Sequence, residues 1–397
     1  MIKDDFPIFE NSSLVFLDNG ATTHKPNIVI DAISYYYKNL NSNIGRGVYK
    51  LAEKSTDAYE HTREKISKFI NAPVKNIIYT AGTTMSLNIV ANNIKQHIKP
   101  NGKIVLSILE HHANILPWQR LAKELNLEII YISDNETLAN PLLLPDDFWK
   151  DVKIVSLTHT SNVTGQILPI KEWCYLAKKH KAISVIDGAQ GISSEIVNIT
   201  EIDCDFYAFS AHKLYAPMGV GVLYMSDKFI NSDPLLLGGG IIEDVTENNY
   251  FLLEDNHRFE AGTPNVADIY ALSTTLDYLQ SQNWSTLILN MKKLELSLYE
   301  KLKSDNRIQI LNEESREFFN HSHIISFNLK GIHAHDVGTF LSEEDIAVRV
   351  GKHCTHPLHH FLKASASVRV SFGIYNTEED ITKLIDSINR CFKFFGV

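Results

Sequence analysis

Short apolar stretches alternate with amphipathic stretches along the first two thirds of the chain. The apolar stretches have the length of buried strands and lie at 77–80, 103–109, 154–158, 183–186, 206–209 and 219–225. Apolar residues at helical spacing predict helices at 26–37, 56–70, 87–98, 118–125 and 171–181. Strands that alternate with helices predict an α/β fold with a mostly parallel sheet covered on both faces.

The pattern changes in the last third of the chain. Helical periodicity runs from 266 to 302, with Trp284 near a plausible hinge. Strands are then predicted at 324–329, 346–350 and 367–372, with a helix at 335–341. A terminal helix is predicted to start at Thr377, where Asp380 completes a capping-box pattern. These segments predict a second, smaller α+β unit.

The composition is that of an ordinary soluble globular protein. The chain has 397 residues, 44% of them hydrophobic and 21% charged, which is enough for about two domains. The net charge of -9 argues against a nucleic-acid footprint. Four scattered cysteines without a C-x-x-C motif fit a reducing cytosol. The first ten residues lack the apolar core of a signal peptide and no apolar run could span a bilayer, so we expect a cytoplasmic protein without membrane contact.

Polar residues follow several of the predicted strands. In a mostly parallel sheet, ligands bind beyond the carboxyl ends of the strands. Here those ends carry His111, Asn162, Asp187 and the pair His212 and Lys213. One polar strand end is usually a turn residue, but four from separate strands indicate a candidate site.

Lys213 ends the stretch F-Y-A-F-S-A-H-K, in which an apolar strand stops abruptly at polar residues. Burying an ammonium group is costly unless it is paired or used chemically. A desolvated lysine loses its proton more easily, which makes Lys213 a candidate Schiff-base nucleophile. The alternative is a solvated lysine that caps the strand end.

A second candidate element is the strand 77–80 followed by Gly82, Thr83, Thr84 and a helix. The glycine permits close approach of a ligand, the hydroxyls can donate hydrogen bonds, and the helix N-terminus favours an anion. The alternative is a helix cap without a ligand.

Arg46, between two glycines, could approach a ligand or a partner subunit, or belong to a solvated loop.

Together these residues meet the needs of pyridoxal phosphate (PLP), which requires a lysine, a carboxylate at the pyridinium nitrogen and phosphate donors. Lys213 and Asp187 supply the first two. The candidate phosphate ligands are Gly82, Thr83, Thr84, Ser210 and His212. His111 can stack on the ring, and Asn162 and Gln190 can reach its phenolic oxygen.

Eight motifs carry a family resemblance, and they follow one another in the order in which the family has them. They are L-D-N-G-A-T-T (17–23), G-T-T (82–84), E-H-H-A-N-I-L-P-W-Q (110–119), S-N-V-T-G (161–165), D-G-A-Q (187–190), H-K-L-Y (212–215), R-F-E-A-G-T-P-N (258–265) and R-V-G-K-H-C (349–354). The chain resembles the fold-type I PLP enzymes of the class V aminotransferase group and, more narrowly, the SUF-type (group II) cysteine desulfurases. The resemblance implies a large PLP-binding domain (20–285) with a mostly parallel seven-stranded sheet. It also implies a small domain (1–19 and 286–397) that carries a catalytic cysteine loop.

The resemblance also implies a role for each matching residue. Lys213 would bind the cofactor and move the Cα proton, with His111 as the other catalytic residue near it. The cofactor ligands would be Thr83, Thr84, His111, Asn162, Asp187, Gln190, Ser210, His212, Lys213 and Thr263, the last contributed by the other subunit of a homodimer. Arg369 would clamp the substrate carboxylate through a bidentate fork, with Arg349 and Asn162 beside it.

The chain departs from the family pattern at several positions. Around G-T-T it has Ala81 and Met85 in place of arginine and glutamate, and Gly45 replaces a histidine. Near the lysine it has Ala211, Ala216 and Met218. None of these changes removes a group with covalent chemistry, so they concern subunit coupling and loop geometry.

Cys354 follows Lys352 and His353 in a loop that begins at Gly351. Neighbouring cations favour the thiolate form of a cysteine, which could take the substrate sulfur as a persulfide. The alternatives are an idle exposed cysteine, or a zinc site with the nearby histidines His353, His356, His359 and His360. Their spacing is not a standard zinc pattern, and we predict no metal. The other cysteines, Cys174, Cys204 and Cys391, are predicted core residues.

The resemblance implies a homodimeric enzyme that converts L-cysteine to L-alanine and leaves sulfur on Cys354. A small sulfur-acceptor protein would carry the sulfur to iron–sulfur cluster assembly. The alternatives are a selenocysteine lyase, another PLP-dependent β-eliminase of the same fold, or a scaffold without turnover. The pair of Lys213 and Asp187 argues against the scaffold, which needs neither residue.

Overall fold

The computed structural model describes residues 2–45 and 47–397. Arg46, for which a ligand or subunit contact was considered, lies outside the described residues. The helices are α1 (Asn27–Asn39), α2 (Lys50–Phe69), α3 (Thr83–Ile94), α4 (Leu116–Leu125), α5 (Asn135–Ala139), α6 (Ile170–Lys179), α7 (Gly191–Ser194), α8 (Ile199–Ile202), α9 (Val266–Ser281), α10 (Trp284–Lys303), α11 (Ala334–Glu343), α12 (His356–Phe361) and α13 (Glu378–Phe395). The strands are β1 (Val15–Phe16), β2 (Ile77–Thr80), β3 (Lys103–Ser107), β4 (Glu128–Ile132), β5 (Val152–Thr158), β6 (Ile183–Asp187), β7 (Phe206–Ser210), β8 (Gly221–Met225), β9 (Ile242–Val245), β10 (Tyr250–Leu252), β11 (Ile308–Ile310), β12 (Ile324–Leu329), β13 (Ile346–Ala347), β14 (Arg349–Gly351) and β15 (Ser367–Ser371).

The main sheet has seven strands in the order β2-β8-β7-β6-β5-β3-β4. The five strands from β7 to β4 are parallel, and β8 is antiparallel to both of its neighbours. The prediction of a mostly parallel seven-stranded sheet is therefore confirmed. Because parallel strands end at the same edge, the residues that follow β5, β6 and β7 meet there.

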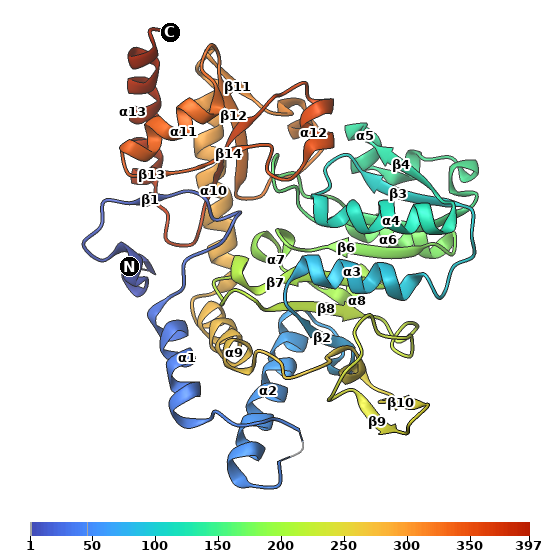
Figure 1. The fold of residues 1–397 in the computed structure, drawn as a ribbon. Helices are drawn as coiled ribbons and strands as arrows, with labels where there is room; N and C mark the ends of the chain where they lie inside the picture. Colours follow the sequence, from blue (N-terminus) through green and yellow to red (C-terminus); the bar gives the residue numbers. More distant parts are fainter. Residues whose placement is uncertain (1, 46) are drawn as a thin grey trace.

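Helices cover both faces of this sheet (Figure 1). The alternation of side chains along β7 explains why both faces are apolar. Phe206 and Ala208 belong to one hydrophobic cluster, with residues of α3 and α4. Tyr207 and Phe209 point the other way, into a second cluster with residues of α6, α9 and α10.

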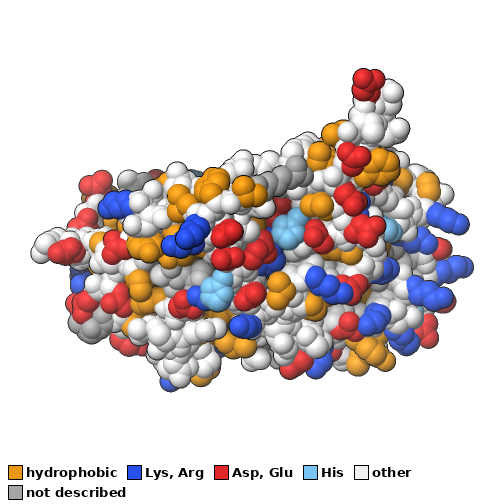
Figure 2. All heavy atoms as spheres, turned by 90° about the horizontal axis from the view of Figure 1, so that it is seen from below, with side chains coloured by type: hydrophobic (Ala, Val, Ile, Leu, Met, Phe, Trp, Pro, Cys, Tyr) orange, Lys and Arg blue, Asp and Glu red, His pale blue; other side chains and the backbone are white. Residues whose placement is uncertain are grey.

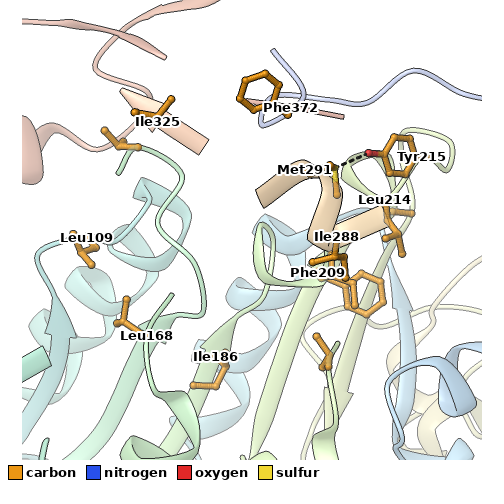
Figure 3. Close-up of a cluster of buried hydrophobic side chains, with 14 of the residues drawn as sticks. Leu109, Leu168, Ile186, Phe209, Leu214, Tyr215, Ile288, Met291, Ile325 and Phe372 are labelled. Carbon is orange, nitrogen blue, oxygen red and sulfur yellow. Dashed lines mark hydrogen bonds between the residues drawn. The ribbon is translucent and has the colours of Figure 1, made fainter. Parts of the chain in front are cut away.

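The second cluster continues into a smaller antiparallel sheet of order β11-β12-β15-β14. Figure 3 shows part of it, from Ile186 and Phe209 on the main sheet through Met291 on α10 to Ile325 and Phe372. The N-terminal strand β1 pairs with β13 beside this sheet. The cluster thus fixes the small sheet against the end of the large one, where the predicted site residues lie.

The structure confirms the helix break near Trp284, since α9 ends at Ser281 and α10 begins at Trp284. The capping box of Thr377 and Asp380 is also present at the start of α13. The predicted strand 346–350 is wrong as one element, because it divides into β13 and β14, which pair with different strands. The domain limits at 19/20 and 285/286 stay a prediction.

Several elements were missing from the prediction, or began elsewhere. The helix predicted from residue 56 begins at Lys50, and β4, β9, β10, β11, α5 and α12 were not predicted. β4 is an edge strand with partly exposed residues, and β9 and β10 form a largely exposed hairpin. Such elements lack the buried apolar stretch on which the prediction depended. Within the described residues, no helix is both long and apolar enough to cross a membrane.

Candidate active site

A cavity of about 360 Å³ opens where the strand ends of the main sheet meet the small sheet. Its lining residues are Gly20, Ala21, Thr83, Thr84, His111, Ala113, Thr158, Thr160, Asn162, Asp187, Ala189, Gln190, Ser210, His212, Lys213, Arg349, His353, Cys354 and Arg369. The structure therefore brings together every predicted site residue except Thr263 and Gly82, and Gly82 lies next to Thr83 at the start of α3.

Lys213 lies just beyond β7 in a turn of 3-10 helix, Ala211–Lys213. Burial, helped by the positive charge of Arg369, lowers the pKa of Lys213 to about 8, although Asp187 and Cys354 act in the opposite direction. A substantial fraction of this amine is therefore neutral near physiological pH. This is the property that a nucleophilic or proton-transferring lysine needs.

Asp187 ends β6, the strand next to β7, and is 3% exposed. Burial raises its pKa, while the charge of Lys213 opposes the rise. Its Oδ1 accepts a hydrogen bond from Ala189 N at 2.9 Å, which orients the carboxyl group. A buried carboxyl group of this kind is suited to pair with a positively charged or N–H group of a ligand.

His111 stands at the end of the segment that follows β3. Burial, reinforced by the charge of Lys213, lowers the pKa of His111 to about 3, so the ring is neutral. Its Nδ1 accepts a hydrogen bond from Ala113 N at 3.1 Å. The proton of the neutral ring is therefore on Nε2, which makes that atom a hydrogen-bond donor.

Glu110 fixes this turn, a function that the sequence prediction missed. It is fully buried and accepts hydrogen bonds from Ser107 Oγ, Asn114 Nδ2 (2.6 Å) and Thr158 N (2.9 Å). These bonds tie the end of β3 to the end of β5. Burial raises the pKa of Glu110 to about 8 despite the three donors. Its position beside the histidine in E-H-H was the one available signal in the sequence.

The N-terminus of α3 forms one end of the cavity. Ser210 Oγ accepts a hydrogen bond from Thr83 N at 2.8 Å and lies 2.7 Å from Thr83 Oγ1. Gly82 has φ +152°, and a Cβ on Gly221 would lie 2.4 Å from the Gly82 Cα. The two glycines therefore allow β8 to approach the start of α3 closely.

His212 adds a group without a partner to this end. Its Nδ1 is buried and has no hydrogen-bond partner among the described residues. Burial and the charges of Lys213 and Lys25 lower the pKa of His212 to about 4, so the ring is neutral. A neutral ring nitrogen, two hydroxyls and a helix N-terminus suit an anion such as a phosphate.

Arg369 is a residue of β15 and lies on the side of the cavity opposite the start of α3. It is 3% exposed. Its Nη1 donates to Asn162 O at 3.0 Å and its Nη2 donates to Asp18 Oδ1 at 2.9 Å. Arg349 pairs opposite Arg369 on β14 and places Nη1 3.7 Å from Asp18 Oδ2. Asp18 therefore holds both arginines, a role that the sequence prediction did not assign to it.

Two predicted cofactor ligands, Asn162 and Gln190, donate hydrogen bonds from their side-chain amide nitrogens to backbone carbonyls of the protein. Asn162 Nδ2 donates to His353 O at 2.9 Å, and Gln190 Nε2 donates to Gly20 O at 2.7 Å. Gln190 Oε1 is buried and has no hydrogen-bond partner among the described residues. These bonds link the strand ends to the N-terminal segment and to the cysteine loop.

Cys354 lies in the connection from β14 to α12 and is the exposed member of the four cysteines; the others are buried. His353 and Cys354 both have positive φ, +47° and +57°. His353 Nε2 lies 2.9 Å from Ser367 Oγ, which anchors the loop to β15. Within residues 2–45 and 47–397, no three His, Cys, Asp or Glu side chains are arranged to hold a metal ion.

Thr263 lies elsewhere, on a separate cavity of about 720 Å³ lined also by Tyr59, Glu60, His257 and Glu260. Glu260 is bound to Arg63 Nη1 at 2.8 Å and to Tyr79 N at 2.7 Å, which fixes this loop. The prediction assigned Thr263 to the site of a second subunit, and it stays a prediction.

Three comparisons place this geometry among known proteins. The family model described as aminotransferase class-V matches residues 15–384. A probable cysteine desulfurase of Vibrio cholerae is 39% identical, over 98% of this chain and 97% of that protein. A cysteine desulfurase of Haloferax volcanii is 34% identical, over 100% and 97%.

Solved structures agree with these sequence matches. The apo structure of a cysteine desulfurase from Thermococcus onnurineus superposes with a TM-score of 0.91 at 34% identity, covering 99% of this chain and 97% of that one. A cysteine desulfurase from Escherichia coli gives a TM-score of 0.89 at 30% identity, covering 99% and 98%. The likeness extends over the whole length of each protein.

Proposed function

We infer that this chain, which belongs to the class V aminotransferase family and to the cysteine desulfurases, converts L-cysteine to L-alanine and leaves the sulfur on Cys354. One observation carries the proposal. Lys213, with its lowered pKa, and the exposed thiol of Cys354 line the same cavity. A proton-transferring base and a sulfur nucleophile are the two groups that this reaction demands.

The cavity fits PLP. Lys213 would bind it covalently, and Asp187 would face its pyridinium nitrogen. Thr83, Thr84, Ser210 and His212 would hold the phosphate at the N-terminus of α3, where His212 Nδ1 lacks a protein partner. His111 would stack on the ring, and Asn162 and Gln190 would lie beside it. When bound, PLP supplies an electron sink that makes the Cα proton of an amino acid removable.

Arg369 is suited to bind the substrate carboxylate. Its guanidinium is almost fully buried, so an incoming carboxylate would meet it in a poorly hydrated site. Asp18 Oδ1 already accepts from Nη2 and holds the guanidinium in a fixed orientation. Arg349 shares Asp18 and is about half exposed, so it can assist at the entrance.

Lys213 would then move the Cα proton, since its neutral amine can accept a proton and return it. The Cys354 thiolate would attack the substrate sulfur. As the new S–S bond forms, the bond between the substrate sulfur and Cβ breaks and its electrons stay with the carbon part. That part takes up protons to become alanine, and His111 Nε2–H is a donor in the cavity. The remaining persulfide holds the sulfur for transfer.

The finer assignment rests on motifs. The loop R-V-G-K-H-C supports placement in the SUF-type group, whose sulfur passes to a small acceptor protein for iron–sulfur cluster assembly. A cytoplasmic location belongs to the same proposal. The test is an assay of alanine and sulfide release from cysteine, with and without a reductant. Release from selenocysteine but not from cysteine would favour the selenocysteine lyase instead.

A homodimer is also part of the proposal. Large exposed apolar side chains occur around α1, at its connection to α2 and near the β9–β10 hairpin; they include Ile28, Ile30, Tyr35, Tyr37, Val48, Tyr49, Leu51, Leu235, Leu236, Leu237, Val245, Tyr250 and Phe251. Figure 2 shows apolar side chains between charged ones on the lower face of the molecule. Exposed apolar groups of this number support a protein contact.

The homodimer predicts that one subunit retains PLP with the help of Thr263 of the other subunit. Thr263 of one subunit would complete the phosphate site of the other, so Thr263→Ala should weaken PLP retention about tenfold, as expected for a lost hydrogen bond to a charged group. Sedimentation should find a dimer for both proteins. A fully active monomer that keeps PLP after this substitution would contradict the proposed exchange of residues.

Arg369→Lys tests the carboxylate clamp. A lysine keeps the charge but lacks the planar fork, so kcat/KM for cysteine should fall about a hundredfold. PLP content should stay normal, because the phosphate would be held at the other end of the cavity. Arg349→Lys is the matched control and should have a smaller effect, since Arg349 is about half exposed. Equal effects of the two substitutions would argue against a special role for Arg369.

A further inference from the structure

His112 joins the segment after β3 to the loop and helix that follow β14. Its backbone N donates to Cys354 O at 2.8 Å. Its side-chain Nε2 accepts from His356 N at 3.2 Å and lies 3.0 Å from His356 Nδ1. The planes of the two rings are tilted by 30° to each other, and the ring centroids are 4.8 Å apart. One histidine thus contacts both the cysteine and the start of α12.

These contacts determine the protonation of both rings. Because His112 Nε2 accepts a hydrogen bond from a backbone N–H, this nitrogen carries no proton. His356 Nδ1 lies 3.0 Å from the same nitrogen, and when it carries a proton it shares the His112 Nε2 lone pair with the backbone N–H. Burial, reinforced by His356, lowers the pKa of His112 and favours this neutral form. Protonation of His112 Nε2 would place its N–H opposite the backbone N–H and the Nδ1 of His356, and the hydrogen bond would be lost.

The loop that His112 contacts is held in an unfavourable backbone conformation. His353 and Cys354 are consecutive non-glycine residues with positive φ, which is costly unless neighbouring groups stabilise it. Asn162 Nδ2 binds the carbonyl of His353, and His112 binds the carbonyl of Cys354. With these bonds intact, the Cys354 side chain lines the cavity. Without them, the backbone strain favours a different loop conformation.

We propose that His112 is a positioning residue that holds the Cys354 loop at the cavity, through its side chain on His356 and its backbone N–H on Cys354. Release of this contact would let the loop carry Cys354 outward. The titratable groups that face His112 are His111 on its own segment, Cys354 on the loop and His356 on α12. The consequence for sulfur transfer rests on the proposed function of Cys354, whereas the contact itself does not.

The test is the rate at which a bulky maleimide labels Cys354, located by peptide mass analysis. His112→Ala removes the acceptor for His356 and should speed labelling about three- to tenfold near neutral pH, as expected for the loss of one or two hydrogen bonds. His112→Gln supplies an uncharged amide oxygen in place of Nε2 and should restore the wild-type rate. His360→Ala is the control. It removes a ring whose centroid lies 6.5 Å from that of His356, but it leaves the contact between His356 and His112 in place.

The dependence on pH separates positioning from a loss of folding. Because the pKa of His112 is below its ordinary value of 6.5, the contact should weaken only as the pH falls below that value. The ratio of labelling rates of His112→Ala and wild type should therefore decrease toward one as the pH falls below 6.5, because wild-type His112 is then protonated more often. His112→Gln should instead stay slower than His112→Ala throughout this pH range, because the amide does not titrate.

Two results would overturn the proposal. One is labelling of His112→Ala at the wild-type rate near neutral pH, with unchanged hydrogen exchange over residues 351–356. The other is equal acceleration by His360→Ala, which would mean that any damage to α12 exposes Cys354. Labelling requires neither cofactor nor turnover, so an error in the proposed function would leave this result intact. Only an assay of alanine release would reveal such an error.

Discussion

Lys213→Ala is expected to abolish alanine release from cysteine, by about a thousandfold or more, while the protein remains folded. The reason is that one side chain both binds the cofactor and moves the Cα proton, so no neighbouring group can replace it. Reduction of the holoenzyme with borohydride, followed by peptide mass analysis, should find PLP attached to Lys213. The measurement therefore reports cofactor attachment and turnover on the same residue.

Lys25 is the matched control for this experiment. It is partly buried, burial lowers its pKa to about 8 as for Lys213, and it lies 3.2 Å from His212 O. A lowered pKa alone would predict attachment to either lysine. The location of Lys213 in the cavity with Asp187 predicts attachment to Lys213 only. Finding PLP on Lys25, or on no lysine, would contradict the proposed site.

The rate at which the apo protein takes up PLP should depend on the protonation of Lys213 and therefore on pH. Only the neutral amine attacks an aldehyde, and burial lowers the pKa of Lys213 to about 8. The rate of uptake should therefore rise with pH through about 8 and then level off. A solvated lysine would continue to gain rate up to its ordinary value near 10.5. Stopped-flow absorbance of PLP binding measures this profile.

The strand ends were predictable from the sequence because their signals are local. Each of β5, β6 and β7 is an apolar stretch that stops at a polar residue, and parallel strands bring such ends together. The structure places Asn162, Asp187 and Lys213 around one cavity, as that rule predicts. The same holds for Gly82 and the start of α3, where a strand, a glycine and a helix follow one another directly.

Contacts between distant segments could not be predicted in this way. Asp18 binds Arg369, which lies 351 residues away in the sequence, and nothing near Asp18 indicates this partner. Glu110 was visible only as a charged neighbour of His111, although it is fully buried with three donors. The positive φ of Cys354 depends on bonds from two other segments, so the loop conformation is a property of the fold and not of the local sequence.

Cys354→Ser should separate a desulfurase from an ordinary β-eliminase. The serine variant should still bind PLP and still change its absorbance when cysteine is added, because the cofactor site and Arg369 are intact. Alanine formation from cysteine should fall by about two orders of magnitude or more, as expected when a nucleophile is removed. Mass analysis of the wild type during turnover should find one additional sulfur atom on Cys354.

Cys391→Ala is the control for this substitution. Cys391 is buried on α13, so its loss should affect stability more than chemistry, and activity per folded molecule should match the wild type. The serine variant is also tested with selenocysteine, because the weaker carbon–selenium bond can break without a thiolate. Activity there, together with inactivity on cysteine, would assign Cys354 to the attack on sulfur. Turnover of cysteine by Cys354→Ser at the wild-type rate would instead mean that sulfur leaves without a persulfide, and the β-eliminase would replace the desulfurase as the function of this site.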